Sequence, residues 1–258
     1  MKIIFFGSSR FGYKVCEFIL QKKLSEISAI ITIAEEFKIS YSDSKIKNVL
    51  YKDFSTLSKK YEIPLILIER NLFDYEEIIK SYNADLFLVV GWYHIIPKKI
   101  REIAPLGCVG IHASLLPKYR GGAPLVWAMI NGENETGVSL FYFSDEVDAG
   151  DIVGQKKFPI KHDDTIREVL LKAEESGINL IDEYLPKISN GTASSMQQNN
   201  NEATRFPQRN PNDGEINWEW DKMRIKNFIR AQTKPYPGAF TIINGKKVII
   251  WDASIEEL

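Results

Sequence analysis

Five short apolar runs mark out the first part of the chain. They are rich in Ile, Val, Leu and Phe, and each is apolar at successive positions. The runs are KIIFF (2–6), EISAIITIA (26–34), PLILIE (64–69), DLFLVVG (85–91) and CVGIH (108–112). Short continuous runs of this kind are typical of strands buried on both faces of a parallel sheet.

The stretches between these runs have the spacing of helices. In SSRFGYKVCEFILQKKL, the apolar residues Phe11, Val15 and Ile19 share one helical face, and FSTLSKKYE and DYEEIIKSYN predict shorter amphipathic helices. The alternation predicts an α/β fold, an open, mostly parallel, Rossmann-like sheet with helices on both faces. Ligands bind such sheets beyond the carboxyl ends of the strands, and His112 ends one of the predicted strands.

A second group of elements follows. Residues 135–160 predict two strands joined by the acidic turn SDEVDAGD. Residues 163–191 predict a long amphipathic helix, because Asp163 to Thr165 can cap its start and Asn190-Gly191 can end it. We therefore expect the main, catalytic domain to span residues 1–192.

The remaining sequence predicts a linker and a small appendage. Residues 193–204 are polar and of low complexity, which is typical of a linker or loop. Within residues 205–258, we expect a helix at about 219–231 and then two strands with an Asn244-Gly245 hairpin turn. The second region is thus a small, β-rich C-terminal appendage, and its hairpin is a candidate contact for a homodimer.

Composition limits the kinds of partner. The 33 basic and 34 acidic residues give a formal net charge of −1, which argues against a protein that mainly neutralises nucleic acid phosphates. Cys16 and Cys108 are far apart in the sequence and form no CxxC motif, which is typical of buried free thiols in a reducing compartment. The sequence contains no visible cluster of metal ligands, so we expect no metal. No secretory leader or apolar run of membrane-spanning length is present, which predicts a cytoplasmic protein without a membrane partner.

His112 is the first candidate for chemistry. A lone histidine often only satisfies a partly buried hydrogen bond, but a neutral imidazole at a strand end can also act as a general base near pH 7. Such a base needs a carboxylate partner, and the acidic turn offers Asp145, Glu146, Asp148 and Asp151. The alternative for this turn is a solvated hairpin loop.

The segment HASLLPKYRGGAP, followed by WAMINGENETGVS and DEVDAGDI, resembles a known family. It is similar to the 10-formyltetrahydrofolate-dependent formyltransferases, above all the sugar N-formyltransferases, which share this domain with methionyl-tRNA formyltransferase. The resemblance covers roughly residues 1–190, and DGEINW and IRAQTKPYPGAF resemble the start of the family's C-terminal domain. It implies an enzyme that moves a formyl group from the folate to a primary amine.

The resemblance also implies a catalytic trio of Asn, His and Asp around the formyl carbon. His112 and Asp148 occupy the His and Asp positions and would act as the acid/base pair, but Gly110 stands at the Asn position. Losing an oxyanion donor of this type typically costs about 10²–10³ in rate. Another donor could substitute, such as the His112 imidazolium, a water or a backbone N–H. Otherwise the chain is a catalytically silent module that binds folate and a nucleotide sugar.

For the co-substrate 10-formyltetrahydrofolate, the resemblance points to the loop VVGWYHIIP and to the turn between Phe143 and Asp148. Backbone groups of the loop would read the pterin edge, and apolar side chains would cover its faces. The expected folate-binding residues are Trp92, His94, Ile95, Ile96, Ser114, Phe143 and Val147. Ordinary core or loop packing is the alternative for the loop residues.

The second substrate is predicted to be a small-molecule, nucleotide-linked amino sugar. The turn GSSRFG could place N–H groups near a phosphate or be only a tight strand-to-helix turn, and nearby basic residues could bind a diphosphate or the folate tail. The candidate residues are Gly7, Ser8, Ser9, Arg10, Lys118 and Arg120. The alternative, methionyl-tRNA, would call for a longer C-terminal domain and a basic insertion, whereas segment 35–52 is only mildly basic.

Overall fold

The computed structural model describes residues 1–38 and 45–256, and its contacts divide the chain into two units. Unit 1 comprises residues 1–112, 139–155 and 177–198, and unit 2 comprises residues 113–138, 156–176 and 199–258. Residues 39–44 of the mildly basic segment 35–52 lie outside the described residues.

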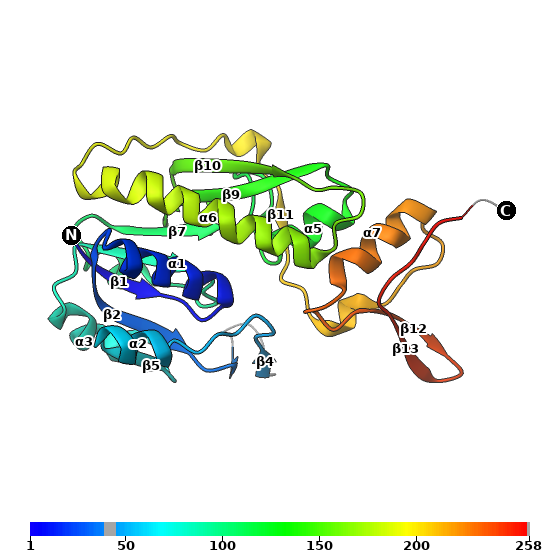
Figure 1. Ribbon diagram of the computed structural model, residues 1–258, viewed down its shortest axis with the longest axis horizontal. Helices are drawn as coiled ribbons and strands as arrows, with labels where there is room; N and C mark the ends of the chain where they lie inside the picture. The colour runs from blue at the N-terminus through cyan, green and yellow to red at the C-terminus, as the bar shows by residue number, and fades with distance from the viewer. Residues whose placement is uncertain (39–44, 257–258) are drawn as a thin grey trace. The chain divides into compact units, whose positions relative to one another are not determined.

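A seven-stranded sheet organises unit 1 (Figure 1), in the order β10-β9-β7-β6-β1-β2-β5, and residues 135–138 of β9 and 156–159 of β10 are counted in unit 2. Its strands are β1 (Lys2–Phe6), β2 (Glu26–Ile33), β5 (Leu65–Ile68), β6 (Leu86–Val90), β7 (Cys108–His112), β9 (Glu135–Tyr142) and β10 (Ile152–Pro159). Strands β5, β2, β1, β6 and β7 each run parallel to their neighbours in this order, while β9 is antiparallel to β7. The predicted open, mostly parallel sheet is therefore confirmed.

Helices cover both faces of this sheet, as predicted. They are α1 (Arg10–Lys22), α2 (Ser55–Tyr61), η1 (Leu72–Tyr75), α3 (Glu76–Ser81) and α4 (Lys98–Arg101). Two small strands, β3 (Glu36–Lys38) and β4 (Lys45–Lys47), form a separate antiparallel pair. Ser9 caps the start of helix α1, because its hydroxyl accepts a hydrogen bond from Gly12 N. On the opposite face, Ile79 of α3 and Ile100 of α4 belong to one core with Phe6 and Val89.

The strand register brings the carboxyl ends of three strands to the same edge of the sheet. Phe6 lies opposite Val89, and Val89 lies opposite Gly110, so β1, β6 and β7 end side by side. The segments that follow these strands therefore start at the same edge, where ligands of open α/β sheets bind. His112 is the last residue of β7 at this edge.

Unit 2 is built from shorter elements. They are β8 (Arg120–Gly121), α5 (Pro124–Ile130), η2 (Asn200–Glu202), β11 (Arg205–Phe206), η3 (Pro211–Gly214), α7 (Lys222–Gln232), β12 (Ala239–Ile243) and β13 (Lys246–Ile250). The hairpin of β12 and β13 turns at Asn244 and Gly245, which both have positive φ, as the predicted hairpin turn requires. Helix α6 (Ile166–Ser189) starts in unit 2 and ends in unit 1. None of the helices in the described parts of the chain is long and apolar enough to cross a membrane.

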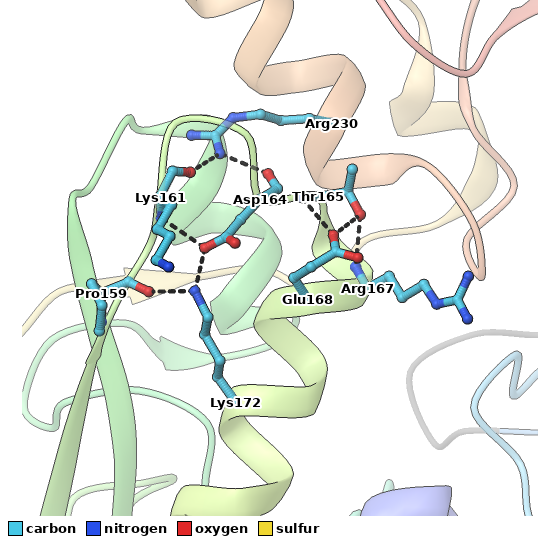
Figure 2. Close-up of polar contacts among 8 residues, drawn as sticks. All are labelled: Pro159, Lys161, Asp164, Thr165, Arg167, Glu168, Lys172 and Arg230. Carbon is cyan, nitrogen blue, oxygen red and sulfur yellow. Dashed lines mark hydrogen bonds and ion pairs between the residues drawn. The ribbon is translucent and has the colours of Figure 1, made fainter.

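A polar cluster joins α7 to the start of α6 within unit 2 (Figure 2). Arg230 Nη1 donates to the carbonyl oxygens of Lys161, at 3.0 Å, and Asp164, at 2.8 Å. The Asp164 carboxylate accepts from Lys161 N and pairs with Lys172 Nζ. Since the guanidinium bonds two carbonyls that precede α6, it holds that loop against α7.

Replacing Arg230 with Met should lower the free energy of unfolding by about 1.5 kcal/mol, because charge-assisted bonds to two carbonyls are lost while the apolar stem remains. Urea denaturation followed by circular dichroism measures this change. Lys222→Met, at the exposed first position of α7, is the matched control and should shift stability by less than about 0.5 kcal/mol. Equal losses in the two variants would refute the anchoring role.

Candidate active site

The structure brings His112 and Asp148 together. His112 Nδ1 lies 3.6 Å from Asp148 Oδ2, and the two side chains are only 10% and 15% exposed. This distance is longer than a hydrogen bond but short enough for an ion pair, and catalytic hydrogen bonds are often long before substrate binds. Of the carboxylates in the acidic turn, Asp148 thus faces the imidazole, whereas Asp145 pairs with Arg101.

The backbone around Asp148 is held by a residue that the sequence did not single out. Gln198 Nε2 donates to the carbonyl oxygens of Asp148, at 2.9 Å, and Gly150, at 2.7 Å. Gln198 is 7% exposed, although it belongs to the polar segment interpreted as a linker. Asp148 itself has φ of 56°, a left-handed conformation that costs energy in a residue other than glycine. Gln198 therefore helps to fix the turn that aims the carboxylate.

Gly110 lies under an aromatic ring. A Cβ at this position would come within 2.4 Å of Phe143 Cε1 and 2.9 Å of the Val89 carbonyl oxygen. Phe143 stacks on Phe141 with ring centroids 5.2 Å apart, and the rings of Phe141 and His112 lie nearly perpendicular with centroids 6.4 Å apart. Phe143 thus occupies the space in which a side chain at position 110 would start. This contact gives a steric reason for the glycine.

The predicted folate loop after β6 is divided between core and surface. Ile96 is 1% exposed and belongs to the core, whereas Ile95 is 64% exposed. The Trp92 indole packs edge-on against Phe6 and His94. Trp92 Nε1 is buried, and it has no hydrogen-bond partner within residues 1–38 and 45–256. Burial lowers the pKa of His94, so its imidazole favours the neutral form.

Unit 1 also contains a pocket of about 530 Å³, and neither His112 nor Asp148 is among the residues that line it. Its walls are the segment 98–108, which includes α4, and residues 142–145 at the end of β9 and the start of the acidic turn. Phe143 is among the lining residues, and Val147 further along the turn is 51% exposed. The volume falls within the range of small-molecule sites.

Three N–H groups of the turn after β1 are hydrogen-bonded within the protein. Gly7 N donates to Ile31 O, Ser8 N donates to Gly91 O, and Arg10 N donates to Leu50 O. Ser8 and Ser9 are buried, while the Arg10 side chain is exposed. These bonds are those of a tight strand-to-helix turn, so only the Arg10 side chain is presented to solvent.

The other predicted contacts lie in unit 2. Ser114 is buried and donates to the Lys118 carbonyl oxygen at 2.7 Å, while the Lys118 side chain is exposed. Arg120 is 1% exposed, and its guanidinium donates to Asn200 Oδ1 at 2.8 Å. Arg120 therefore stabilises unit 2 from inside.

Comparison with protein families agrees with this architecture. Residues 1–185 match the family model described as formyl transferase, and residues 209–258 match the model for the formyl transferase C-terminal domain. Fold and matches together define a group-transfer enzyme. The chain belongs to the formyl transferase family, which confirms the family and the enzyme class predicted from sequence.

Similar proteins differ in their second substrate. A methionyl-tRNA formyltransferase from Halalkalibacterium halodurans is 33% identical over 257 residues, which cover 97% of this chain and 77% of that protein. An N-formyltransferase from Helicobacter canadensis, solved in complex with folinic acid and dTDP-3-aminofucose, has a TM-score of 0.72 at 26% identity and covers 96% of this chain and 86% of that one. A 4-N formyltransferase from Francisella tularensis shares the fold, with a TM-score of 0.75 at 19% identity over 100% of this chain and 98% of its own.

Proposed function

We propose that this enzyme transfers the formyl group of 10-formyltetrahydrofolate to the primary amine of a nucleotide-linked amino sugar. The observation that carries the proposal is the buried pair of His112 and Asp148 at the carboxyl end of the parallel strands. An imidazole that faces a carboxylate on one nitrogen is oriented to exchange a proton on the other.

In this mechanism the amine nitrogen attacks the formyl carbon, and the new C–N bond forms as the amine loses a proton. His112 accepts that proton at Nε2, because Nδ1 faces Asp148. The resulting imidazolium is stabilised by the Asp148 carboxylate and donates a hydrogen bond to the oxyanion. Cleavage of the bond between the formyl carbon and folate N10 completes the transfer, and N10 takes up the proton.

Several features of unit 1 fit the folate. The pocket of about 530 Å³ has the size of a small-molecule site, and Trp92 Nε1 is a buried donor without a partner in the described residues. Ile95 and Val147 are exposed apolar side chains on the loop and the turn expected to enclose the pterin. Burying their surface against a flat ring would favour binding.

Two observations favour the amino sugar. The formal net charge of −1 provides little attraction for a polynucleotide, and the N-formyltransferase from Helicobacter canadensis was solved with dTDP-3-aminofucose. The exposed Arg10 of unit 1 is a candidate group for the diphosphate. The second candidate is methionyl-tRNA, favoured by the relative from Halalkalibacterium halodurans.

The test is a formylation assay with 10-formyltetrahydrofolate and separate acceptors: dTDP- and UDP-linked amino sugars, and charged methionyl-tRNA. We expect mass spectrometry to find a formylated amino sugar, with kcat/KM at least about 10²-fold above that for methionyl-tRNA. Formylation of the tRNA alone would establish the second candidate. Tight folate binding without any product would instead identify a silent binding module.

A further inference from the structure

Arg101 crosses between the two segments that enclose the proposed folate site. At the end of α4, its Nη1 donates to the Ile96 carbonyl oxygen at 2.8 Å, and its Nη2 pairs with Asp145 Oδ1 at 2.5 Å. The Arg101 side chain is only 12% exposed, whereas that of Asp145 is 69% exposed. The guanidinium therefore lies inside the pocket wall and joins the loop after β6 to the acidic turn.

The chemistry of these contacts matches that of a pterin edge. A guanidinium presents adjacent N–H donors in one plane, and the 2-amino-4-oxo edge of a pterin also presents adjacent N–H donors in one plane. Both need acceptors, and the Ile96 carbonyl and the Asp145 carboxylate are acceptors beside the pocket. Arg101 now uses the bonds that a pterin edge would need.

We propose that Arg101 determines the affinity for the folate by competing with the pterin for Ile96 O and Asp145, and that it swings out when the folate binds. This inference rests on the proposed function, since it concerns the same site. The competition lowers the apparent affinity by the fraction of molecules in which Arg101 is bound to these acceptors.

The strength of the bonds that Arg101 makes to Ile96 O and Asp145 determines how far they lower the affinity for the folate. Asp145 is exposed and also lies 3.5 Å from Lys98 Nζ, so its pair with Arg101 is screened by solvent. The bond to the carbonyl of the buried Ile96 is the stronger contribution. If the free energy of one such hydrogen bond favours the bound position of Arg101, the affinity for the folate falls roughly tenfold.

The experiment measures binding of 5-formyltetrahydrofolate by isothermal titration calorimetry to the wild type and to Arg101→Met, which keeps an apolar stem but has no N–H donors. We expect the variant to bind about tenfold more tightly. Lys99→Met is the matched control, because Lys99 lies on the same helix and pairs with Glu76 at 2.7 Å, away from the residues that line the pocket. Its affinity should stay within about twofold of wild type.

A second probe, a tetrahydropterin without the glutamyl tail, separates pterin recognition from attraction of the tail carboxylates. The proposal expects the same gain for both probes. Weaker or unchanged binding of 5-formyltetrahydrofolate to Arg101→Met would overturn the competition while leaving the proposed function in place. If neither protein bound either probe, both proposals would be wrong.

Discussion

Replacing His112 with Ala is expected to lower the rate of formyl transfer by about 10²–10⁴-fold, the usual contribution of a positioned general base. The loss should appear mainly in kcat, because the imidazole acts on the amine proton and the oxyanion, which develop during the reaction. Asp148→Asn should also slow turnover, since it removes the charge that faces Nδ1. Steady-state kinetics with the amine identified in the formylation assay measures both effects.

The chain offers a matched control for this substitution. His162 is exposed and bonds to Asp163 at 3.1 Å, so His162→Ala should leave kcat within about twofold of wild type. The melting temperature of His112→Ala should show that the protein remains folded. Turnover of His112→Ala within threefold of wild type would disprove its role as the base.

Gly110→Asn is expected to damage the protein rather than restore the family's missing amide. The new Cβ would overlap Phe143 and press on the Val89 carbonyl oxygen, at 2.4 and 2.9 Å. Overpacking of this kind costs about 1–3 kcal/mol of stability. We therefore expect a lower urea midpoint and lower activity from the single variant.

The double variant Gly110→Asn/Phe143→Ala separates the steric effect from the chemistry. Removing the ring opens space for the amide, and a working oxyanion donor would raise kcat by up to about 10²–10³ over Phe143→Ala alone. Phe143→Ala is the matched reference, because it carries the same cavity without the amide. A Gly110→Asn variant as stable and active as wild type would contradict the steric explanation.

The positions of the main strands along the chain, and of His112 at the end of one of them, could be read from the sequence because both depend on local patterns. Apolar runs predict buried strands wherever they lie in the fold, and the end of the run at 108–112 is a local feature. The antiparallel pairing of β9 with β7 required knowledge of which strands are neighbours. No local periodicity carries that information.

The contacts that shape the site join residues far apart in the chain. Gly110 is explained by Phe143, and the Asp148 turn is held by Gln198. The polar run around Gln198 is typical of a linker by composition, and nothing in it indicates a buried amide. Such contacts depend on which side chains converge in space, which a single sequence does not record.

Gln198 lies at the point where the chain passes from unit 1 to unit 2. Residue 198 is the last of unit 1 in this stretch, and residue 199 begins the final segment of unit 2. The polypeptide thus leaves unit 1 immediately after the residue whose side chain donates hydrogen bonds to the carbonyl oxygens of Asp148 and Gly150. The turn that carries the Asp148 carboxylate is consequently bonded to the last residue of unit 1 in this stretch, and we expect a change in chain length there to shift that carboxylate relative to His112.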